Sequence, residues 1–152
     1  MPAASSGSGE QNQDRSSDLV YRICHVDVSE VFSPPRVCLE AAKFGLIAGD
    51  AMDLTTGWDF TRQDHRREAE RRIDEQKPLV LIGSPPCTAF SQLQSLSPAS
   101  DRKEITLQEG IEHMRFVVTL YEKQVEAGRV FVHENPARAK SWALPEIRKM
   151  MR

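Results

Sequence analysis

An alternation of short apolar runs with helical segments is the feature that most constrains the fold of this chain. Residues 79–82 are continuously apolar and lie between Pro78 and Gly83, which is typical of a strand buried on both faces of a parallel sheet. Residues 130–132 form a second such run, which we also expect to be buried. Between the two runs, residues 104–127 carry apolar side chains at alternating steps of three and four, at Ile111, Met114, Val118, Tyr121 and Val125. This spacing predicts a long amphipathic helix that connects the two strands.

The same alternation extends over most of the chain. Strands are predicted near residues 21–28, 46–54, 79–83 and 129–133, and helices over residues 37–44, 64–76, 104–127 and 145–152, with a polar loop at 92–103. This order predicts an α/β fold, a Rossmann-like parallel sheet with helices on both faces. We expect one domain over residues 19–152, preceded by a disordered Ser- and Gly-rich tail over residues 1–18.

Bulk composition excludes several classes of protein. The net charge of −2 gives the whole chain no electrostatic attraction to nucleic acid, although a local basic face remains compatible with it. No apolar run is long enough to span a bilayer, and the first residues lack the pattern of a signal peptide. We therefore expect an intracellular protein without a membrane partner. The three cysteines are widely spaced and the histidines show no ligand spacing, so neither a disulfide framework nor a metal site is predicted.

Polar residues follow every predicted strand. Because ligands bind beyond the carboxyl ends of the strands in open parallel sheets, these residues are candidates for one site. In particular, we expect one cleft to be lined by Cys87, Glu134, Asp53 and Phe32.

Cys87 and Glu134 carry the reactive groups. A lone cysteine is usually a small buried hydrophobe, but Cys87 follows two prolines at a strand end, and prolines hold such a loop rigid. A thiol placed there can be activated by backbone amides or by a cation. An acidic residue after a strand is often solvated surface, yet a desolvated carboxyl at the position of Glu134 can donate a proton.

Two acidic residues follow the second predicted strand. An acid at this position of nucleotide-binding α/β folds binds the hydroxyls of a ribose, which makes Asp53 and Asp59 candidates for cofactor binding. The alternative is that each aspartate caps a turn or a helix. Trp58 and Phe60 flank Asp59 and either cover an adenine ring or belong to the core.

The segment Gly83-Ser84-Pro85-Pro86-Cys87-Thr88-Ala89-Phe90-Ser91 resembles the Pro-Cys loop of cytosine-5 DNA methyltransferases, and His133-Glu134-Asn135-Pro136 is similar to the Glu-Asn motif of that family. The resemblance implies methyl transfer from S-adenosylmethionine to carbon 5 of cytosine in nucleic acid, with DNA favoured over RNA. It implies that Cys87 attacks carbon 6 and that Glu134 contacts and protonates the ring. It also implies cofactor contacts from Glu30, Phe32, Asp53, Asp59 and Pro85, and substrate contacts from Ser84, Pro86, Ser91 and Asn135.

The chain departs from that family in several places. Ser33-Pro34-Pro35-Arg36 stands where a glycine-rich loop is usual, and Thr88 replaces a glutamine. Proline lacks the N–H that a ligand carboxylate or ribose would use. No later Gln-x-Arg motif, target-recognition domain or closing strands are present. We therefore expect an incomplete methyltransferase core: a fragment that lacks its C-terminal half, a divergent relative of the family, or one module of a larger polyprotein. We expect weak cofactor binding without turnover by the isolated chain.

Three other functions remain open. Amino-methyltransferases use a Ser-Pro-Pro loop whose fourth residue is aromatic, where this chain has Cys87. A Cys–His hydrolase would pair Cys87 with His133. A non-catalytic module would bind nucleic acid or a protein partner, and the arginines over residues 62–72 are candidates for phosphate contacts. Acidic residues alternate with those arginines, which is more typical of a solvated helix.

Overall fold

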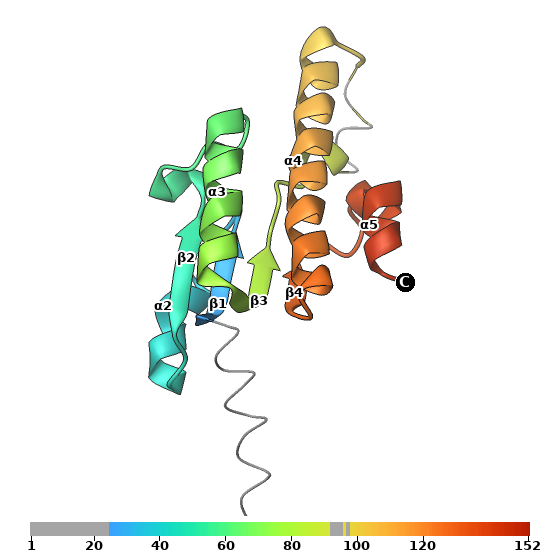
Figure 1. Ribbon diagram of the computed structural model, residues 1–152. Coiled ribbons are helices and arrows are strands. Elements are labelled where there is room, and N and C mark those ends of the chain that lie inside the picture. Colours follow the sequence, from blue (N-terminus) through green and yellow to red (C-terminus); the bar gives the residue numbers. More distant parts are fainter. Residues whose placement is uncertain (1–24, 92–95, 97) are drawn as a thin grey trace, which may run out of the picture.

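The structure, a computed structural model, describes residues 25–91, 96 and 98–152 (Figure 1). The predicted tail, residues 1–18, lies outside the described residues. Four strands form one all-parallel sheet in the order β2-β1-β3-β4. This confirms the predicted α/β, Rossmann-like parallel sheet. The strands are β1 (Val26–Val31), β2 (Ala48–Met52), β3 (Pro78–Gly83) and β4 (Val130–His133).

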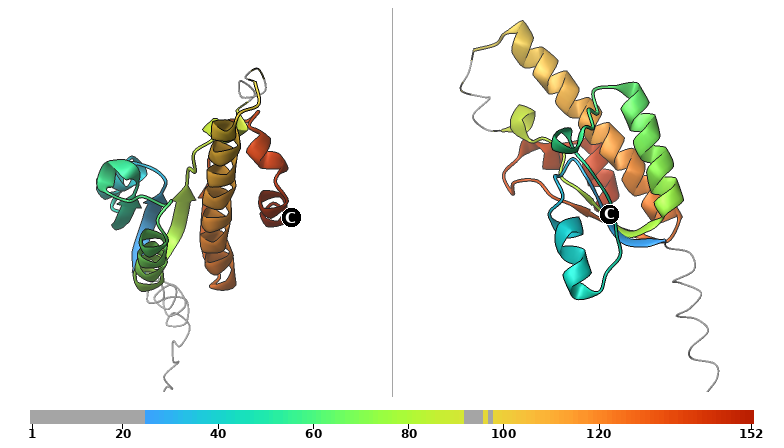
Figure 2. Two further views of the ribbon diagram at one scale, coloured as in Figure 1. Left: turned by 90° about the horizontal axis from the view of Figure 1, so that it is seen from above. Right: turned by 90° about the vertical axis from the view of Figure 1, so that its left-hand side faces the viewer.

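Helices lie on both faces of the sheet, as predicted (Figure 2). On one face, α2 packs against β1 and β2 and continues into a 3₁₀ turn, η1. On the other face lie α3 and α4, and α5 packs against α4. None of the helices in the described part of the chain is long and apolar enough to cross a bilayer. The helical elements are α2 (Val37–Ala41), η1 (Ala42–Phe44), α3 (Gln63–Gln76), α4 (Asp101–Glu126) and α5 (Pro145–Met150).

Strand β1 runs three residues further than the sequence predicts. The sequence pattern ends the strand at Val28 because Ser29 and Glu30 are polar. In the structure both are buried and both have partners: the Ser29 hydroxyl donates to Oε1 of Gln76, and Glu30 accepts hydrogen bonds on the α2 face. A buried polar group with a partner does not oppose the strand, so the strand continues to Val31.

Helix α4 begins at Asp101 rather than Glu104, since Ser100 caps it by accepting a hydrogen bond from the Lys103 N–H at 3.3 Å. Gly128 ends the helix in the left-handed conformation, at φ 69°. Its predicted apolar stripe is correct except for Val125, which is 55% exposed. The buried arc is wider than that stripe, because α4 packs against the sheet, α3 and α5 together.

The prediction that residues 130–132 are buried on both faces is wrong. Val130 is 53% exposed and Val132 is 47% exposed. Both share a sheet face with Val80 and Ile82, their register partners in β3. On this face α2 packs against β1 and β2. The opposite edge strand, β4, therefore remains open to solvent on this face, which a sequence pattern alone does not reveal.

The carboxyl end of β3 requires a glycine. A Cβ added at Gly83 would overlap the hydroxyl of Tyr121 and lie 2.7 Å from Cγ2 of Val117. Both neighbours belong to α4 and are fully buried. The absence of a side chain at Gly83 therefore lets α4 approach the sheet where the chemically interesting loops begin.

We expect Gly83→Ala to destabilise the fold by about 2 kcal/mol, because the added methyl overpacks a buried contact that cannot open without moving α4. Urea unfolding measures the loss. In a Tyr121→Phe background the same substitution should cost about 1 kcal/mol less, since the hydroxyl that the methyl meets is gone. A Gly83→Ala protein as stable as the parent would contradict the packing described here.

Candidate functional site

All four strand ends are level at the carboxyl edge of the sheet. Val31 of β1 pairs in register with Met52 of β2 and with Gly83 of β3, and Gly83 pairs with His133 of β4. The residues that follow, Phe32, Ser84 and Glu134, therefore leave the sheet side by side. This register is the physical reason why loops far apart in the sequence meet at one place.

A pocket of about 350 Å³ lies at this edge. It is lined by Cys87 and Glu134 together, as the sequence predicts, and Phe32 also contributes to it. Cys87 is half-buried and Glu134 is exposed. The other lining residues are Ser33, Arg36, Ser84, Pro85, Pro86, Thr88, Asn135 and Pro136.

The Cys87 loop is fixed at both ends. At its start, the Ser84 N–H donates to the Val31 carbonyl at 3.0 Å, and Nδ2 of Asn135 donates to the Pro85 carbonyl at 3.3 Å. At its end, a short 3₁₀ turn, η3 (Thr88–Phe90), buries Phe90 against Gly110 of α4, where an added Cβ would lie 3.2 Å from the Phe90 ring. The thiol is therefore carried on a segment with little freedom to move, as a reacting group requires.

Glu30 holds the loop after β1 rather than lining the pocket. Its side chain is 1% exposed. Oε2 accepts the N–H groups of Arg36 at 3.0 Å and Cys38 at 2.8 Å, and Oε1 accepts the Ser33 hydroxyl at 3.0 Å. Burial by itself raises the pKa of Glu30, but these hydrogen bonds outweigh burial and leave the pKa below its ordinary value. The carboxylate therefore orders the chain between β1 and α2.

Phe32 is the strained residue of that loop. Its φ of 57° lies in the left-handed region, which bulky residues rarely adopt. The conformation is stabilised by an N–H bond to the Met52 carbonyl at 2.8 Å and by ring packing on Phe60, with centroids 4.6 Å apart. Strain of this kind persists only where the surroundings enforce it, and it is commonest at functional sites.

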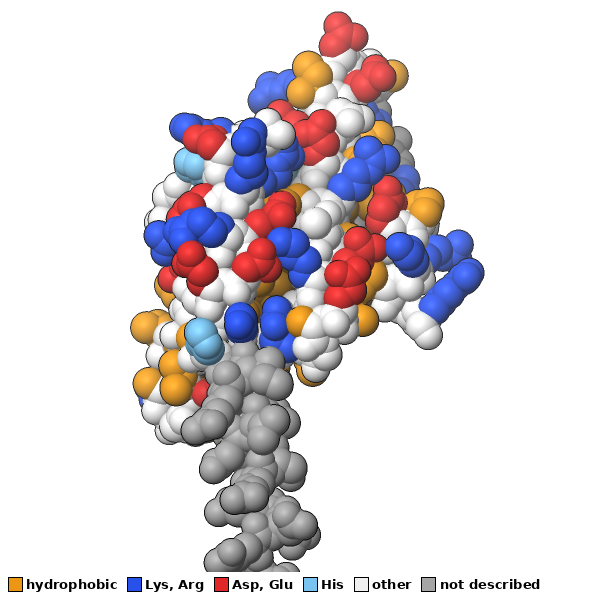
Figure 3. Space-filling view, in the orientation of Figure 1, with side chains coloured by type: hydrophobic (Ala, Val, Ile, Leu, Met, Phe, Trp, Pro, Cys, Tyr) orange, Lys and Arg blue, Asp and Glu red, His pale blue; other side chains and the backbone are white. Residues whose placement is uncertain are grey.

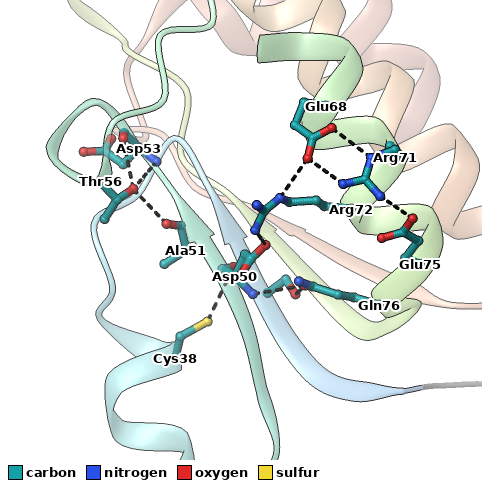
Figure 4. A network of polar contacts seen from close by, with 11 residues as sticks. Cys38, Asp50, Ala51, Asp53, Thr56, Glu68, Arg71, Arg72, Glu75 and Gln76 are labelled. Atoms are coloured by element: carbon teal, nitrogen blue, oxygen red, sulfur yellow. Dashed lines mark hydrogen bonds and ion pairs between the residues drawn. The ribbon is translucent and has the colours of Figure 1, made fainter. Parts of the chain in front are cut away.

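Asp53 does not share the cleft of Cys87, so that expectation is wrong. Asp53 follows β2, the edge strand next to β1, whereas the pocket lies over the ends of β1, β3 and β4. Oδ2 of Asp53 accepts the Thr55 N–H at 2.9 Å, and the Thr56 hydroxyl accepts the Asp53 N–H at 2.9 Å. Figure 4 shows this capped turn next to the ion pair between Asp50 and Arg72. Asp53 therefore caps a turn, which was the alternative interpretation of this residue.

Asp59 and Ser91 also lie outside the residues that line the pocket. Oδ1 of Asp59 accepts the N–H and the hydroxyl of Thr61 at 3.0 and 2.6 Å, so this aspartate too caps a turn. Trp58 and Phe60 pack on the main core. The second alternative for these aromatic residues, core packing, is therefore what the structure shows.

Arg36 also lines the pocket, although it was not predicted as a site residue. Within the pocket's lining it supplies the cationic group, and Glu134 supplies the anionic group. Its position directly after Pro34-Pro35 at the end of a strand was the available signal. A guanidinium there can stabilise a thiolate or bind a phosphate.

His133 is placed unfavourably for a Cys–His hydrolase. Its ring does not line the pocket. Nδ1 lies 2.9 Å from the Tyr121 hydroxyl, and Nε2 faces Nδ2 of Asn135 at 3.5 Å. Both ring nitrogens thus contact groups other than Cys87. Across residues 25–91, 96 and 98–152, no cluster of three or more His, Cys, Asp or Glu side chains has metal-binding geometry.

The arginines of α3 form ion pairs on the surface. Arg71 pairs with Glu68 and Glu75, and Arg72 bridges Glu68 and Asp50. Figure 3 shows basic and acidic side chains interleaved over this face. The pattern is that of a solvated helix rather than a continuous basic surface.

The two cysteines in the described residues have different environments. Cys38 is buried, its thiol lies 3.6 Å from the Val28 carbonyl, and burial raises its pKa to about 12. Cys87 is half-buried at the pocket. Only the second of these positions is open to an incoming molecule.

Comparison with protein-family models, with curated proteins and with solved structures finds no match to this chain.

Glu30→Gln should reduce the free energy of unfolding by about 2 kcal/mol at pH 7, because a buried charged acceptor of three hydrogen bonds becomes a neutral amide. The folded pKa of Glu30 lies below 4.5, so its stabilisation is complete above that pH and is lost as the pH falls through the folded value. The difference in the free energy of unfolding between the parent and Glu30→Gln should therefore become smaller in acid. Ser33→Ala, which removes one of the bonds, should cost about 1 kcal/mol. A constant difference down to pH 3 in urea unfolding would exclude this role.

Alkylation rates should separate Cys87 from Cys38. With a pKa of about 12, Cys38 is thiolate in on the order of one molecule in ten thousand at pH 8, and it is buried. In a Cys24→Ser background, iodoacetamide should modify Cys87 about a hundred times faster than Cys38, as followed by peptide mass spectrometry. Cys87→Ala should abolish the fast reaction, and unfolding should equalise the two sites. Equal rates in the folded protein would show that the thiol of Cys87 is inaccessible.

Proposed function

We propose that the pocket binds a cytosine of nucleic acid, with DNA favoured over RNA, and that the chain is part of a cytosine-5 methyltransferase active site. The observation that supports this proposal is that Cys87 and Glu134, from loops after two different strands, line the same pocket. A nucleophilic thiol and a carboxyl on one pyrimidine ring are the pair that addition to carbon 6 requires.

Cys87 is the nucleophile in this proposal. Its thiolate forms a bond to carbon 6, and the electron pair of the 5,6 double bond moves to carbon 5. Glu134 donates a hydrogen bond or a proton to the ring nitrogen and so stabilises the negative charge that develops on the ring. After carbon 5 has taken up the methyl group, loss of its original proton and expulsion of the thiolate restore the double bond and the free cysteine.

Solvent must leave before Glu134 acts as an acid. The side chain is exposed in the open pocket, and a carboxyl donates a proton near neutral pH only when it is desolvated. The base itself therefore has to cover Glu134. A base inside a duplex cannot reach the pocket, so it has to be unstacked at a cost of about a few kcal/mol.

Phe32 and Pro85 line the pocket, so these two of the five residues predicted to bind the cofactor fit the proposal. S-adenosylmethionine, when bound, supplies the methyl group for carbon 5. Arg36 at the same edge offers a cation for a carboxylate. The prolines at positions 34 and 35 offer no N–H, and Glu30 is already bonded. We therefore propose weak binding of the cofactor by this chain alone.

The thiol distinguishes the proposal from the amino-methyltransferase alternative. That chemistry uses an aromatic ring at position 87 to stack on the base, and the nearest aromatic residue in the loop, Phe90, is buried against α4 rather than facing the pocket. Phe32 is the aromatic side chain in the lining, and it comes from a different loop. The geometry favours covalent addition over stacking.

Tritium release tests the base-binding half of the site without the cofactor. Addition of Cys87 to carbon 6 makes carbon 5 basic, so a proton from water joins it and the tritium of a [5-³H]cytosine oligonucleotide is lost on reversal. We expect release by the parent chain, no release by Cys87→Ala, and a decrease on the order of 10²-fold for Glu134→Gln. Asp53→Ala serves as the matched control, because its carboxylate lies outside the pocket.

The same oligonucleotides with labelled S-adenosylmethionine test methyl transfer. We expect little transfer by residues 1–152 alone and complete dependence on Cys87 in any longer active protein. Methyl transfer that survives Cys87→Ala would overturn the cytosine-5 proposal and favour the amino-methyltransferase.

A further inference from the structure

A chain of hydrogen bonds runs from the core of α4 to the Cys87 loop. Tyr121, fully buried, places its hydroxyl 3.2 Å from the Gly83 carbonyl and 2.9 Å from Nδ1 of His133. On the other side of the ring, Nε2 faces Nδ2 of Asn135 at 3.5 Å. That same amide nitrogen donates to the Pro85 carbonyl at 3.3 Å. This series of hydrogen bonds therefore connects the loop that carries Glu134 to the loop that carries the nucleophile.

The orientation of the Asn135 amide is fixed by its other partners. Its Oδ1 accepts the Ser141 hydroxyl at 3.2 Å. Its Nδ2 lies near two carbonyl oxygens, those of Pro85 and Glu134, which only accept. The nitrogen that faces His133 is thus a donor.

The donors favour one tautomer of His133. The two hydrogens of Nδ2 of Asn135 are shared among three acceptors, and the contact with Nε2 is the longest of them. An amide nitrogen cannot accept a hydrogen bond, so a proton on Nε2 would find no acceptor there, which favours the tautomer with the ring proton on Nδ1. That proton then goes to the oxygen of Tyr121, whose own proton goes to the Gly83 carbonyl. The other tautomer would leave two donors facing each other at Nε2.

We infer that His133 is a positioning residue, whose neutral ring holds Asn135 against the Cys87 loop and whose protonation releases that link. A proton on Nε2 would face the hydrogens of the Asn135 amide, so a contact between a donor and an acceptor would become a contact between two donors. The amide would have to turn, and the bond to the Pro85 carbonyl would weaken with it. The inference deepens the proposed function, and it rests on that function for its activity readout.

The surroundings keep the ring neutral near pH 7. Burial lowers the pKa of His133 below its usual 6.5, although the charge of Glu134 works in the opposite direction. Tyr121 faces the ring from α4, and burial raises the pKa of its hydroxyl, so it stays a phenol. From the turn after β4, the Trp142 ring meets the imidazole edge-on, with centroids 5.1 Å apart, and brings no charge.

Nuclear magnetic resonance of the ¹⁵N-labelled chain tests the link without any variant or substrate. We expect Nδ1 of His133 to carry the proton at pH 7.5, and we expect the side-chain amide signals of Asn135 to shift on acidification with the same midpoint as the ring. A proton on Nε2, or an Asn135 amide that does not follow the ring, would overturn the inference.

The pH profile of tritium release provides the activity readout, with His133→Gln as the variant that cannot titrate. Cys87 and Glu134 are present in both proteins, so the ratio of the parent's rate to the variant's isolates His133. We expect the ratio to fall about tenfold for each pH unit below the transition of His133, as one proton requires. When Asn135→Ala is added to both proteins, the ratio should no longer change with pH.

Two outcomes of these experiments are decisive. A ratio that does not change with pH while Asn135 is intact would overturn the inference. No release by the parent at any pH, with the linked titration seen by resonance, would overturn the proposed function and support the link.

Discussion

The rest of the site depends on two hydrogen bonds that the carbonyl of Gly83 accepts. This carbonyl accepts the N–H of Glu134 at 2.9 Å and the hydroxyl of Tyr121 at 3.2 Å. The first bond continues the β3–β4 ladder by one residue, and the second anchors the long helix to the sheet at the same atom. Only a glycine at this position leaves room for the hydroxyl of Tyr121. The nucleophile loop begins at the next residue, so its starting point is set by sheet and helix together.

Hydrogen bonds from buried and half-buried polar groups fix the conformation of the loops at this site, whereas the exposed charged groups can contact a ligand. Glu30 is fully enclosed and orders the segment after β1. Asn135, which is half-buried, joins the loops after β3 and β4. Glu134 and Arg36, by contrast, are exposed at the pocket. A polar group that is buried and fully bonded rigidifies its neighbourhood, and an exposed charge stays free to meet a ligand.

Periodicity was enough to predict the sheet, because short apolar runs and a long amphipathic stripe follow from burial alone. The strand order, which puts β2 at one edge of the sheet and β4 at the other, has no local signature in the sequence, and this is why Asp53 was expected in the pocket. Cys87 and Glu134 were found because each follows a recognisable strand. Tyr121 and Arg36 were not selected, and His133 was considered only as the partner of Cys87 in a hydrolase. The two residues His133 and Tyr121 matter through contacts between distant segments, and Arg36 matters through the path of one loop.

Covalent capture tests the central claim most directly. An oligonucleotide with 2-pyrimidinone in place of cytosine forms a stable adduct when a thiol adds to carbon 6, and the reaction needs no methyl donor. Intact-mass and peptide analysis of residues 1–152 after incubation should find one adduct, on the peptide that contains Cys87, and none on Cys38. An adduct confined to another cysteine, or no adduct although Cys87 alkylates readily, would contradict the account of this pocket as a cytosine site.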